Sequence, residues 1–440
     1  MTENTPIAVV ILAAGKGTRM KSDLPKVMHP IAGRPMINWL IETAEKLNPE
    51  KIIVVTAPDM DDVAKAVRPY QTVVQKQQRG TGDAVRPALD MLKGFQGKVL
   101  ILLGDEPFLD KNILEKMIKW DGLSVMAVRP LSPAGLGRMV VHDDGTLDRI
   151  IEDKDCTPEQ KEIRLCNAGN FCIPNAHLEN WLAQLKTDNT QKEYYLTDIP
   201  QIAEKEGFLT YVVEADAQWV WGINTRSELA EHERMAQTML RNKAMENGAT
   251  LIDPNTVYLS ADTKIGKDVV IEPNVYFGSG VSVGDHTVIH AFSHIEGAQI
   301  EANVEIGPFA RIRPKSVLKQ GAVVGNFIEV NRSVMGAGAK SKHLSYLGDA
   351  IIGDKANIGA GTVIANYDGF NKHTTTIGEK AFIGTNSTIV APVEIGNGAM
   401  IAAGSTINKD IPDNAMAVGR ARQKNYAGWA TEYRKAKSGE

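Results

Sequence analysis

Residues that could bind phosphate lie together near the start of the chain. Ile7–Leu12 is an unbroken apolar run, typical of a parallel strand buried on both faces, and a glycine-rich segment follows it. Glycine lets the backbone approach a ligand and point N–H groups at phosphate oxygens, and basic side chains add charge-assisted hydrogen bonds. The glycines and basic residues of this segment are Gly15, Gly17, Lys16, Arg19, Lys21 and Lys26. Since neither G-x-G-x-x-G nor G-x-x-x-x-G-K-[ST] occurs here, neither of those mechanisms is assumed, and a solvated basic turn is the alternative.

A histidine in the second half of the chain could act as a general base. His343 lies in KSKHLSYLGD and is followed by NIGAGT and by the polar sequence NYD at Asn366. Moving an acetyl group from a thioester to an amine requires an unprotonated amine, and histidine titrates close to neutral pH. A single histidine is more often structural or solvated, but this polar setting favours catalysis.

The composition indicates a protein of two or more domains, because 440 residues are too many for one core. A net charge of −4 argues against a nucleic-acid polymer or an anionic membrane as the main partner. The first residues lack a basic region leading into an apolar one, and no apolar run reaches membrane-spanning length, so we expect a cytoplasmic protein. The cysteines have no metal-ligand spacing and are interpreted as small buried hydrophobes: Cys156, Cys166 and Cys172.

The first half alternates apolar strands with helical patterns. Further strands are expected at Lys51–Thr56 and Lys98–Leu103, and helices at 36–47, after Pro35, and at Thr81–Leu92. This alternation predicts a Rossmann-like α/β domain with a mostly parallel sheet covered on both faces. Ligands bind at the carboxyl ends of such strands, where both the glycine-rich segment and Asp105 would lie. A helix cap after the strand is the alternative for Asp105.

A helix rich in charged residues is expected at Thr225–Gly248, with Leu229, Ala236, Leu240 and Ala244 along one face. We interpret it as a linker between two domains. The predicted division is an α/β domain at residues 1–226, a linker helix at 227–247 and a second domain with a C-terminal tail at 248–440.

A six-residue period fills the second half. Apolar residues recur at 265–295, 300–330, 352–364 and 377–407, often followed by glycine. This hexapeptide repeat predicts a parallel β-helix, in which one apolar residue per short strand points into a continuous core. Two interruptions are expected, one at Asn331–Ser345 and one between Ile364 and Ile377, and loops at such places can build sites.

The string LAAGKGTRM…LPK resembles the signature of sugar-1-phosphate nucleotidyltransferases. The resemblance implies that Leu12, Ala13, Ala14 and Gly15 pack on the nucleotide, that Arg19 and Lys26 contact phosphates during catalysis, and that Asp105 and Asn224 hold Mg²⁺. It also implies residues that read uracil, namely Gln75, Gly80 and Thr81, and residues that contact the sugar, namely Gly137, Glu152 and Asn167. The sequence departs from the family after Glu152, where Asp153 follows, and at Asn167-Ala168-Gly169. A solvated acidic stretch is the alternative for Glu152.

Nearly the whole chain resembles the bacterial bifunctional enzymes that are both N-acetylglucosamine-1-phosphate uridylyltransferases and glucosamine-1-phosphate N-acetyltransferases. By that resemblance the β-helix is left-handed, three chains share each acetyltransferase site and His343 is the base. The implied residues for the amino-sugar phosphate are Arg313, Asn331, Tyr346 and Asn357. Those implied for acetyl-CoA are Ala360, Asn366, Tyr367, Thr385, Ala403 and Arg420. Thr385 replaces a serine of the family, and Asn331 replaces a lysine, so Arg313 or Arg332 would have to supply more of the charge.

We therefore expect an enzyme that acetylates glucosamine-1-phosphate and then couples the product to UTP, with Mg²⁺ as cofactor and as a homotrimer. One alternative is a nucleotidyltransferase with a single activity, whose β-helix serves only for oligomerisation. Another is a binding scaffold without catalysis, which would need neither the glycine-rich segment nor Asp105.

Overall fold

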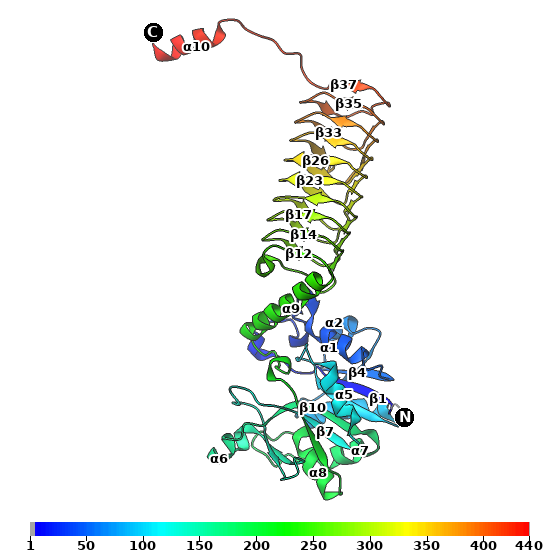
Figure 1. Cartoon of the computed structure of the whole chain (residues 1–440), viewed down its shortest axis with the longest axis vertical. Coiled ribbons are helices and arrows are strands. Elements are labelled where there is room, and N and C mark those ends of the chain that lie inside the picture. Colours follow the sequence, from blue (N-terminus) through cyan, green and yellow to red (C-terminus); the bar gives the residue numbers. More distant parts are fainter. Residues whose placement is uncertain (1–4, 440) are drawn as a thin grey trace. The chain divides into compact units, whose positions relative to one another are not determined.

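The computed structural model describes residues 5–439 (Figure 1) and divides into two compact units, Met1–Ala236 and Gln237–Glu440. The boundary falls inside helix α9 (Arg226–Glu246), so the helix predicted at Thr225–Gly248 is present. A capping box begins it, because Glu228 Oε2 accepts from Thr225 N at 2.8 Å and Thr225 Oγ1 accepts from Glu228 N at 3.2 Å. Gly248, at φ +99°, follows its end.

The first unit contains a mixed sheet with the strand order β11-β7-β10-β6-β1-β4-β5, to which the hairpin β8–β9 is added beside β10. Its strands are β1 (Ile7–Leu12), β4 (Lys51–Thr56), β5 (Gln71–Val74), β6 (Lys98–Leu103), β7 (Leu123–Val128), β8 (Arg138–Val141), β9 (Leu147–Ile151), β10 (Cys166–Pro174) and β11 (Thr210–Glu214). A small separate sheet pairs β2 (Pro30–Ile31) with β3 (Arg34–Pro35).

The sheet is mostly parallel, as predicted. Strand β1 pairs in parallel with β4 and β6, whereas β10 runs antiparallel to β6 and β7. The apolar runs that predicted buried strands are buried, since Val9, Ile53 and Leu100 are fully inaccessible to solvent. The carboxyl ends of β1 and β6 lie side by side, because Gly104 N donates to Leu12 O at 2.9 Å. This pairing brings the glycine-rich segment and Asp105 to the same edge.

Short helices connect these strands. They are α1 (Met36–Glu45), α2 (Asp61–Ala66), α3 (Thr81–Val85), α4 (Leu89–Leu92), α5 (Lys111–Lys119), α6 (Pro158–Lys161), α7 (Asn175–Gln184) and α8 (Ile199–Lys205). The helix predicted at Thr81–Leu92 is divided by a 3-10 turn at Arg86–Ala88. Pro87 explains the division, since proline lacks an N–H and its ring obstructs the preceding turn. Across residues 5–439, none of the helices is both long enough and apolar enough to span a membrane.

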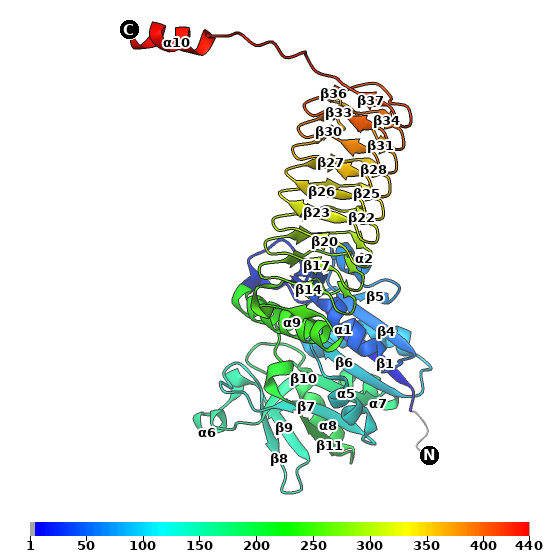
Figure 2. The ribbon, with the colours of Figure 1, turned by 45° about the horizontal axis from the view of Figure 1, so that its top comes forward.

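The second unit is a parallel β-helix of hexapeptide repeats, as predicted, in which very short strands stack into three sheets (Figure 2). The first sheet contains β12 (Thr250–Leu251), β14 (Val270–Ile271), β17 (Val288–Ile289), β20 (Glu305–Ile306), β23 (Val323–Asn326), β26 (Lys340–His343), β29 (Asn357–Ile358), β32 (Phe382–Ile383), β35 (Met400–Ile401) and β37 (Met416–Ala417). The second contains β15 (Tyr276–Phe277), β18 (His294–Ile295), β21 (Arg311–Ile312), β24 (Glu329–Asn331), β27 (Tyr346–Gly348), β30 (Val363–Ala365), β33 (Thr388–Val390) and β36 (Thr406–Ile407). The third contains β13 (Lys264–Ile265), β16 (Ser282–Val283), β19 (Gln299–Ile300), β22 (Val317–Leu318), β25 (Val334–Met335), β28 (Ala350–Ile352), β31 (Thr375–Ile377) and β34 (Val393–Ile395).

The residues of the six-residue period form the continuous core of this unit. Ile271, Ile306, Ile358 and Ile401, which lie in four different coils, are all buried in one cluster. Because each coil adds its apolar residues to the same column, no coil has a core of its own. The C-terminal helix α10 (Trp429–Ser438) contributes no buried residue.

One of the two expected interruptions is wrong. Residues 331–345 stay in the coil, since β25 and β26 pair with the strands of the neighbouring coils. The six-residue beat fails there because the buried residues Val330 and Met335 are only five apart and the next interior position is occupied by Ser341, which is fully buried. The second interruption is real: residues 366–373 lie between β30 and β31 and close on themselves through His373 N, which donates to Asn366 O at 2.8 Å.

Ser341→Ala should raise the free energy of unfolding of the β-helix by about 1 kcal/mol, measured by urea denaturation. Among the described residues, Ser341 Oγ is buried without a hydrogen-bond partner, so the substitution removes an unsatisfied polar atom and creates no new one. Ser333→Ala is the matched control, because Ser333 is equally buried but accepts from Ala350 N at 2.9 Å and donates within the core. It should lower stability, and equal effects of the two variants would contradict the prediction.

Candidate active sites

The first unit has a cavity of about 280 Å³ at the carboxyl ends of β1 and β6. Its lining contains most of the residues expected to bind the nucleotide: Leu12, Ala13, Ala14, Gly15, Lys26, Gln75, Gly80, Thr81 and Asp105. Gln78 and Glu193, which sequence reasoning did not select, also line it. Arg19 is exposed on the 3-10 turn Thr18–Met20 and does not line this cavity.

Lys26 lies between the two residues expected to hold a metal ion. Its Nζ donates to Asp105 Oδ2 in a short ion pair and to Asn224 Oδ1 at 3.0 Å. Two oxygens from distant parts of the sequence therefore converge on one cation. The Lys26 side chain packs on Gly17, where the backbone has φ +59° and a Cβ would lie 2.6 Å from Lys26 Cβ. Only glycine fits there, which explains one glycine of the segment.

Gln75 is buried at the cavity wall, and its amide group is already oriented. Its Nε2 donates to Asp83 Oδ2 at 3.1 Å, which leaves Oε1 as the acceptor available to a ligand. Gly80 next to it has φ +107°, and a Cβ there would lie 2.5 Å from the carbonyl oxygen of Tyr194. A side chain at position 80 would thus push the segment around Tyr194 away from the cavity.

The residues expected to contact the sugar form a second group beside this cavity. Asn167 N donates to Gly137 O at 2.8 Å, and Thr197 Oγ1 donates to Glu152 Oε1 at 2.8 Å. Leu196 N also donates to Thr81 Oγ1 at 3.1 Å, so the segment 193–198 connects both groups. Burial is the main reason that the pKa of Glu152 is raised, with the charge of Asp155 contributing.

His343 on β26 is held by a neighbour from the preceding coil. Its Nδ1 lies 2.8 Å from Asn326 Oδ1 on β23, the residue that pairs with it in register. Because an amide oxygen can only accept, this bond places the proton on Nδ1 and leaves Nε2 with its lone pair. His343 is exposed, so Nε2 is open to a ligand.

Asn326 and His343 stack on one another along one corner of the β-helix, and three of the expected acetyl-CoA residues stack on them in the following coils. Gly361 N donates to His343 O, Asn386 N to Ala360 O at 2.7 Å and Gly404 N to Thr385 O at 2.8 Å. The column thus consists, coil after coil, of Asn326, His343, Ala360, Thr385 and Ala403. A Cβ at Gly404 would lie 3.7 Å from Arg420 Cδ, which brings Arg420 beside the last member.

The residues expected to bind the amino-sugar phosphate lie mostly on the second sheet, which contains β24 and β27, and Asn357 lies on the first. Asn331 is buried at the end of β24, and its Nδ2 donates to Tyr346 Oη at 3.3 Å. Arg313 is paired with Glu329 through an N–H···O contact of 2.8 Å. Asn357 lies on β29 in register with Lys340. In the inserted loop, Asn366 is buried while Tyr367 is exposed.

Comparisons with known proteins agree with this two-part architecture. A model of the MobA-like NTP transferase domain matches residues 9–156, and a model of the bacterial transferase hexapeptide (six repeats) matches residues 262–297 and 374–409. The bifunctional protein GlmU of Paramagnetospirillum magneticum is 47% identical, over 98% of this chain and 97% of its own length. Those of Zymomonas mobilis and Sphingopyxis alaskensis are 46% and 48% identical, and 97% or more of each chain is covered.

The chain belongs to the GlmU family. It is therefore a bifunctional transferase, with a nucleotidyltransferase domain followed by a hexapeptide acetyltransferase domain. Membership in the GlmU family favours the bifunctional interpretation over a single-activity enzyme and over a scaffold without catalysis.

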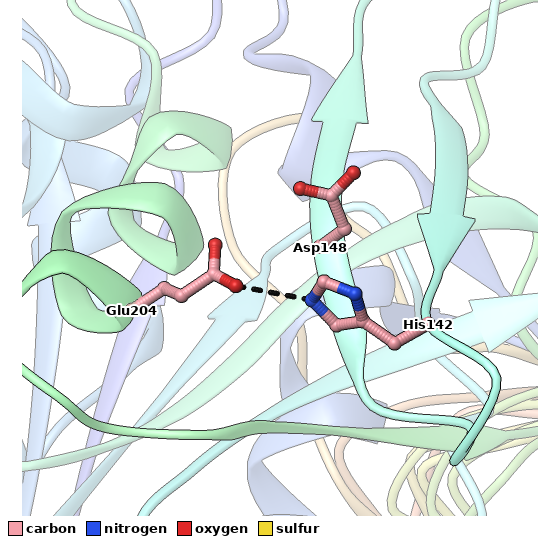
Figure 3. Close-up of side chains that lie close together, drawn as sticks. All are labelled: His142, Asp148 and Glu204. Carbon is pink, nitrogen blue, oxygen red and sulfur yellow. Dashed lines mark hydrogen bonds and ion pairs between the residues drawn. The ribbon is translucent and has the colours of Figure 1, made fainter.

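A further polar cluster lies outside these sites, at the hairpin β8–β9 and helix α8. His142 Nε2 lies 3.0 Å from Glu204 Oε1, and Asp148 is close to both (Figure 3). His142 and Glu204 are exposed, and Asp148 also pairs with Arg149 at 2.8 Å. We interpret this cluster as a network of surface contacts that connects the hairpin β8–β9 to α8.

The carboxyl groups near the residues expected to contact the sugar predict that the stability of the protein depends on pH. Burial raises the pKa of Asp198 to about 6, and the charges of Glu152 and Asp155 contribute. Between about pH 4 and pH 6 the native state retains a proton that the unfolded chain has released, so the stability contributed by this group is lost as the pH rises through that window. Asp198→Asn should therefore exceed the wild type in stability at pH 8 by about 1–2 kcal/mol.

Urea denaturation at pH 4 and pH 8 measures this difference, which should nearly vanish at pH 4. Asparagine is also accepted at the N-terminal cap of α8, where Asp198 lies. An advantage of the variant that is the same at both pH values would show that the carboxylate charge is not the cause.

Proposed function

We propose that this chain makes UDP-N-acetylglucosamine, a precursor of the cell envelope, in two steps. The β-helix transfers acetyl from acetyl-CoA to glucosamine-1-phosphate, and the α/β domain then joins N-acetylglucosamine-1-phosphate to UTP and releases pyrophosphate. The observation that carries the bifunctional assignment is His343 with its Nδ1 held by Asn326, in a chain that also has the nucleotide cavity. We assign these steps to residues 1–226 and 248–440, connected by the helix at 227–247, in the cytoplasm.

In the α/β domain the cavity residues orient the substrates for in-line attack. The Gln75 Oε1 acceptor fits the N3–H of uracil, and the loop Leu12–Gly15 supplies backbone and small side chains against the nucleotide. Glu152, Gly137 and Asn167 would receive the sugar. A phosphate oxygen of N-acetylglucosamine-1-phosphate attacks the α-phosphorus of UTP as the bond to pyrophosphate breaks. Lys26, together with Arg19 brought inward, would bind the triphosphate.

The donor set at the cavity fits Mg²⁺. Asp105 Oδ2 and Asn224 Oδ1 already converge on the ammonium of Lys26, so both oxygens can face a cation in the same place. Hard oxygen ligands, few in number and completed by phosphates, are what this ion prefers. Asp105 and Asn224 would hold it, and it would neutralise charge on the triphosphate.

Asp105→Asn should remove most uridylyl transfer, because a carboxylate that both balances Lys26 and binds the metal ion becomes a neutral amide. Pyrophosphate release from UTP and N-acetylglucosamine-1-phosphate is the measurement. Acetyl transfer on the same preparation is the internal control and should be unchanged. A normal rate of pyrophosphate release would contradict the assignment of Asp105.

In the β-helix the free Nε2 of His343 accepts the proton of the amine. The amine nitrogen attacks the thioester carbonyl, the C–S bond breaks, and the thiolate of coenzyme A leaves and takes up a proton. Asn326 fixes the imidazole tautomer, and Tyr346, Asn331, Asn357 and Arg313 would bind the sugar phosphate. The column Ala360, Thr385 and Ala403, with Asn366, Tyr367 and Arg420, would bind acetyl-CoA.

We also propose a homotrimer in which the inserted loop reaches a neighbour. The loop has its own internal order, since Asp368 Oδ1 accepts from Phe370 N at 2.8 Å and Asp368 Oδ2 contacts His373 at 2.7 Å. It nevertheless exposes large apolar surface, with Phe370 91% exposed and Tyr367 58% exposed. A loop that is ordered by its own hydrogen bonds and exposes aromatic side chains is suited to a contact with another chain.

His343→Ala should slow acetyl transfer by roughly 10²- to 10⁴-fold, mainly in kcat, because general-base catalysis typically contributes that much. Uridylyl transfer should stay unchanged, and added N-acetylglucosamine-1-phosphate should restore product formation. Asn326→Ala should have a smaller effect, since it removes the tautomer preference but leaves the imidazole. Acetyl transfer at the wild-type rate in His343→Ala would show that another group is the base.

A further inference from the structure

Arg332 and Asp349 form a paired contact at one corner of the β-helix, in two successive coils. Arg332 Nε donates to Asp349 Oδ1 at 2.6 Å, and Nη2 donates to Asp349 Oδ2 at 2.7 Å. The Arg332 side chain is 28% exposed and that of Asp349 15% exposed. A bidentate, partly buried pair of this kind holds both side chains in one geometry.

This pair has polar neighbours on both sides. Arg332 Nη1 donates to Asn331 Oδ1 at 3.0 Å, and Asn331 in turn contacts Tyr346. On the other side, Asn366 Nδ2 donates to Asp349 Oδ2. One hydrogen-bonded chain therefore runs from Tyr346 through Arg332 to the start of the inserted loop.

The two ends of this chain belong to different substrates in the proposed function. Tyr346 and Asn331 are assigned to the amino-sugar phosphate, and Asn366 to acetyl-CoA. We propose that the Arg332–Asp349 pair is a positioning device that fixes both substrate subsites at once, which rests on the proposed function of the β-helix. Arg332 acts through Asn331 and Asp349 and does not itself bind the sugar phosphate.

The contacts of Arg332 argue against the simpler role of a replacement for the family lysine. Its charge is neutralised by Asp349, whose pKa is lowered chiefly by the hydrogen bond from Arg332, so the pair stays ionised. Three of the five guanidinium N–H groups are used, two by Asp349 and one by Asn331. A phosphate that bound in bidentate fashion to the Nε–Nη2 edge would have to displace the Asp349 carboxylate.

Steady-state kinetics of acetyl transfer with Arg332→Asn test the proposal. Asparagine tolerates the left-handed backbone at this position, where φ is +52°, so the variant removes the pair without straining the turn. The KM for glucosamine-1-phosphate and that for acetyl-CoA should both rise, each by about tenfold, with a smaller change in kcat. Arg332→Lys keeps the charge but loses the bidentate geometry, and should recover neither KM fully.

Lys315→Asn is the matched control, because Lys315 is an exposed cation at the equivalent left-handed corner one coil earlier, with φ +66°. It should leave both KM values unchanged. Asp349→Asn should resemble Arg332→Asn, and the double variant should be no worse than either single one.

A rise in only the KM for glucosamine-1-phosphate, restored by Arg332→Lys, would identify Arg332 as a phosphate ligand and overturn the proposal. Unchanged KM values in both Arg332 variants would overturn it as well. The rate of uridylyl transfer and the temperature of thermal unfolding show whether each variant is folded. If Arg332→Asn proves unstable, the KM values of Arg332→Lys test the proposal in its place. A wild-type protein without acetyl transfer would instead refute the proposed function, and this inference with it.

Discussion

The coils of the β-helix stack because nearly every six-residue segment places one apolar side chain in a shared core, with Ser341 as an exception. This constraint fixes the position of every other side chain as well, because residues about one coil apart in the sequence come to lie directly above one another. Asn326 meets His343, and Arg332 meets Asp349, for this reason alone. The side chains proposed for the chemistry of the second half therefore lie in columns, one residue from each coil.

The fold could be predicted well from the sequence, because the signals that specify it are local and periodic. The apolar runs of the α/β domain and the hexapeptide period both identified buried strands correctly. The errors have local causes too. A shortened turn and the buried Ser341 hid a continuous coil, and Pro87 divided a predicted helix. The antiparallel strand β10 was not predicted, because its orientation depends on contacts that no local periodicity reveals.

The sites could be predicted only in part. Most of the expected nucleotide residues line one cavity, since the strand-end rule and the family signature point to the same edge. Asn326 was missed, although its distance of one coil from His343 is a signal in the sequence. The pairing of Arg332 with Asp349 was also missed, because a guanidinium that looks free in a sequence is assigned to a ligand before its partner is known. Arg19 is exposed and does not line the cavity, so its expected contact with phosphate stays a prediction.

Lys26 gives the nucleotidyltransferase site a counter-ion of its own. Its ammonium lies between Asp105 and Asn224 and neutralises the carboxylate of Asp105. If Asp105 and Asn224 hold a divalent cation as proposed, that cation would compete with this ammonium for the same oxygens. In the proposed function the phosphates of UTP would offer this ammonium new oxygens in place of those of Asp105 and Asn224, so that metal and nucleotide binding would be coupled through Lys26.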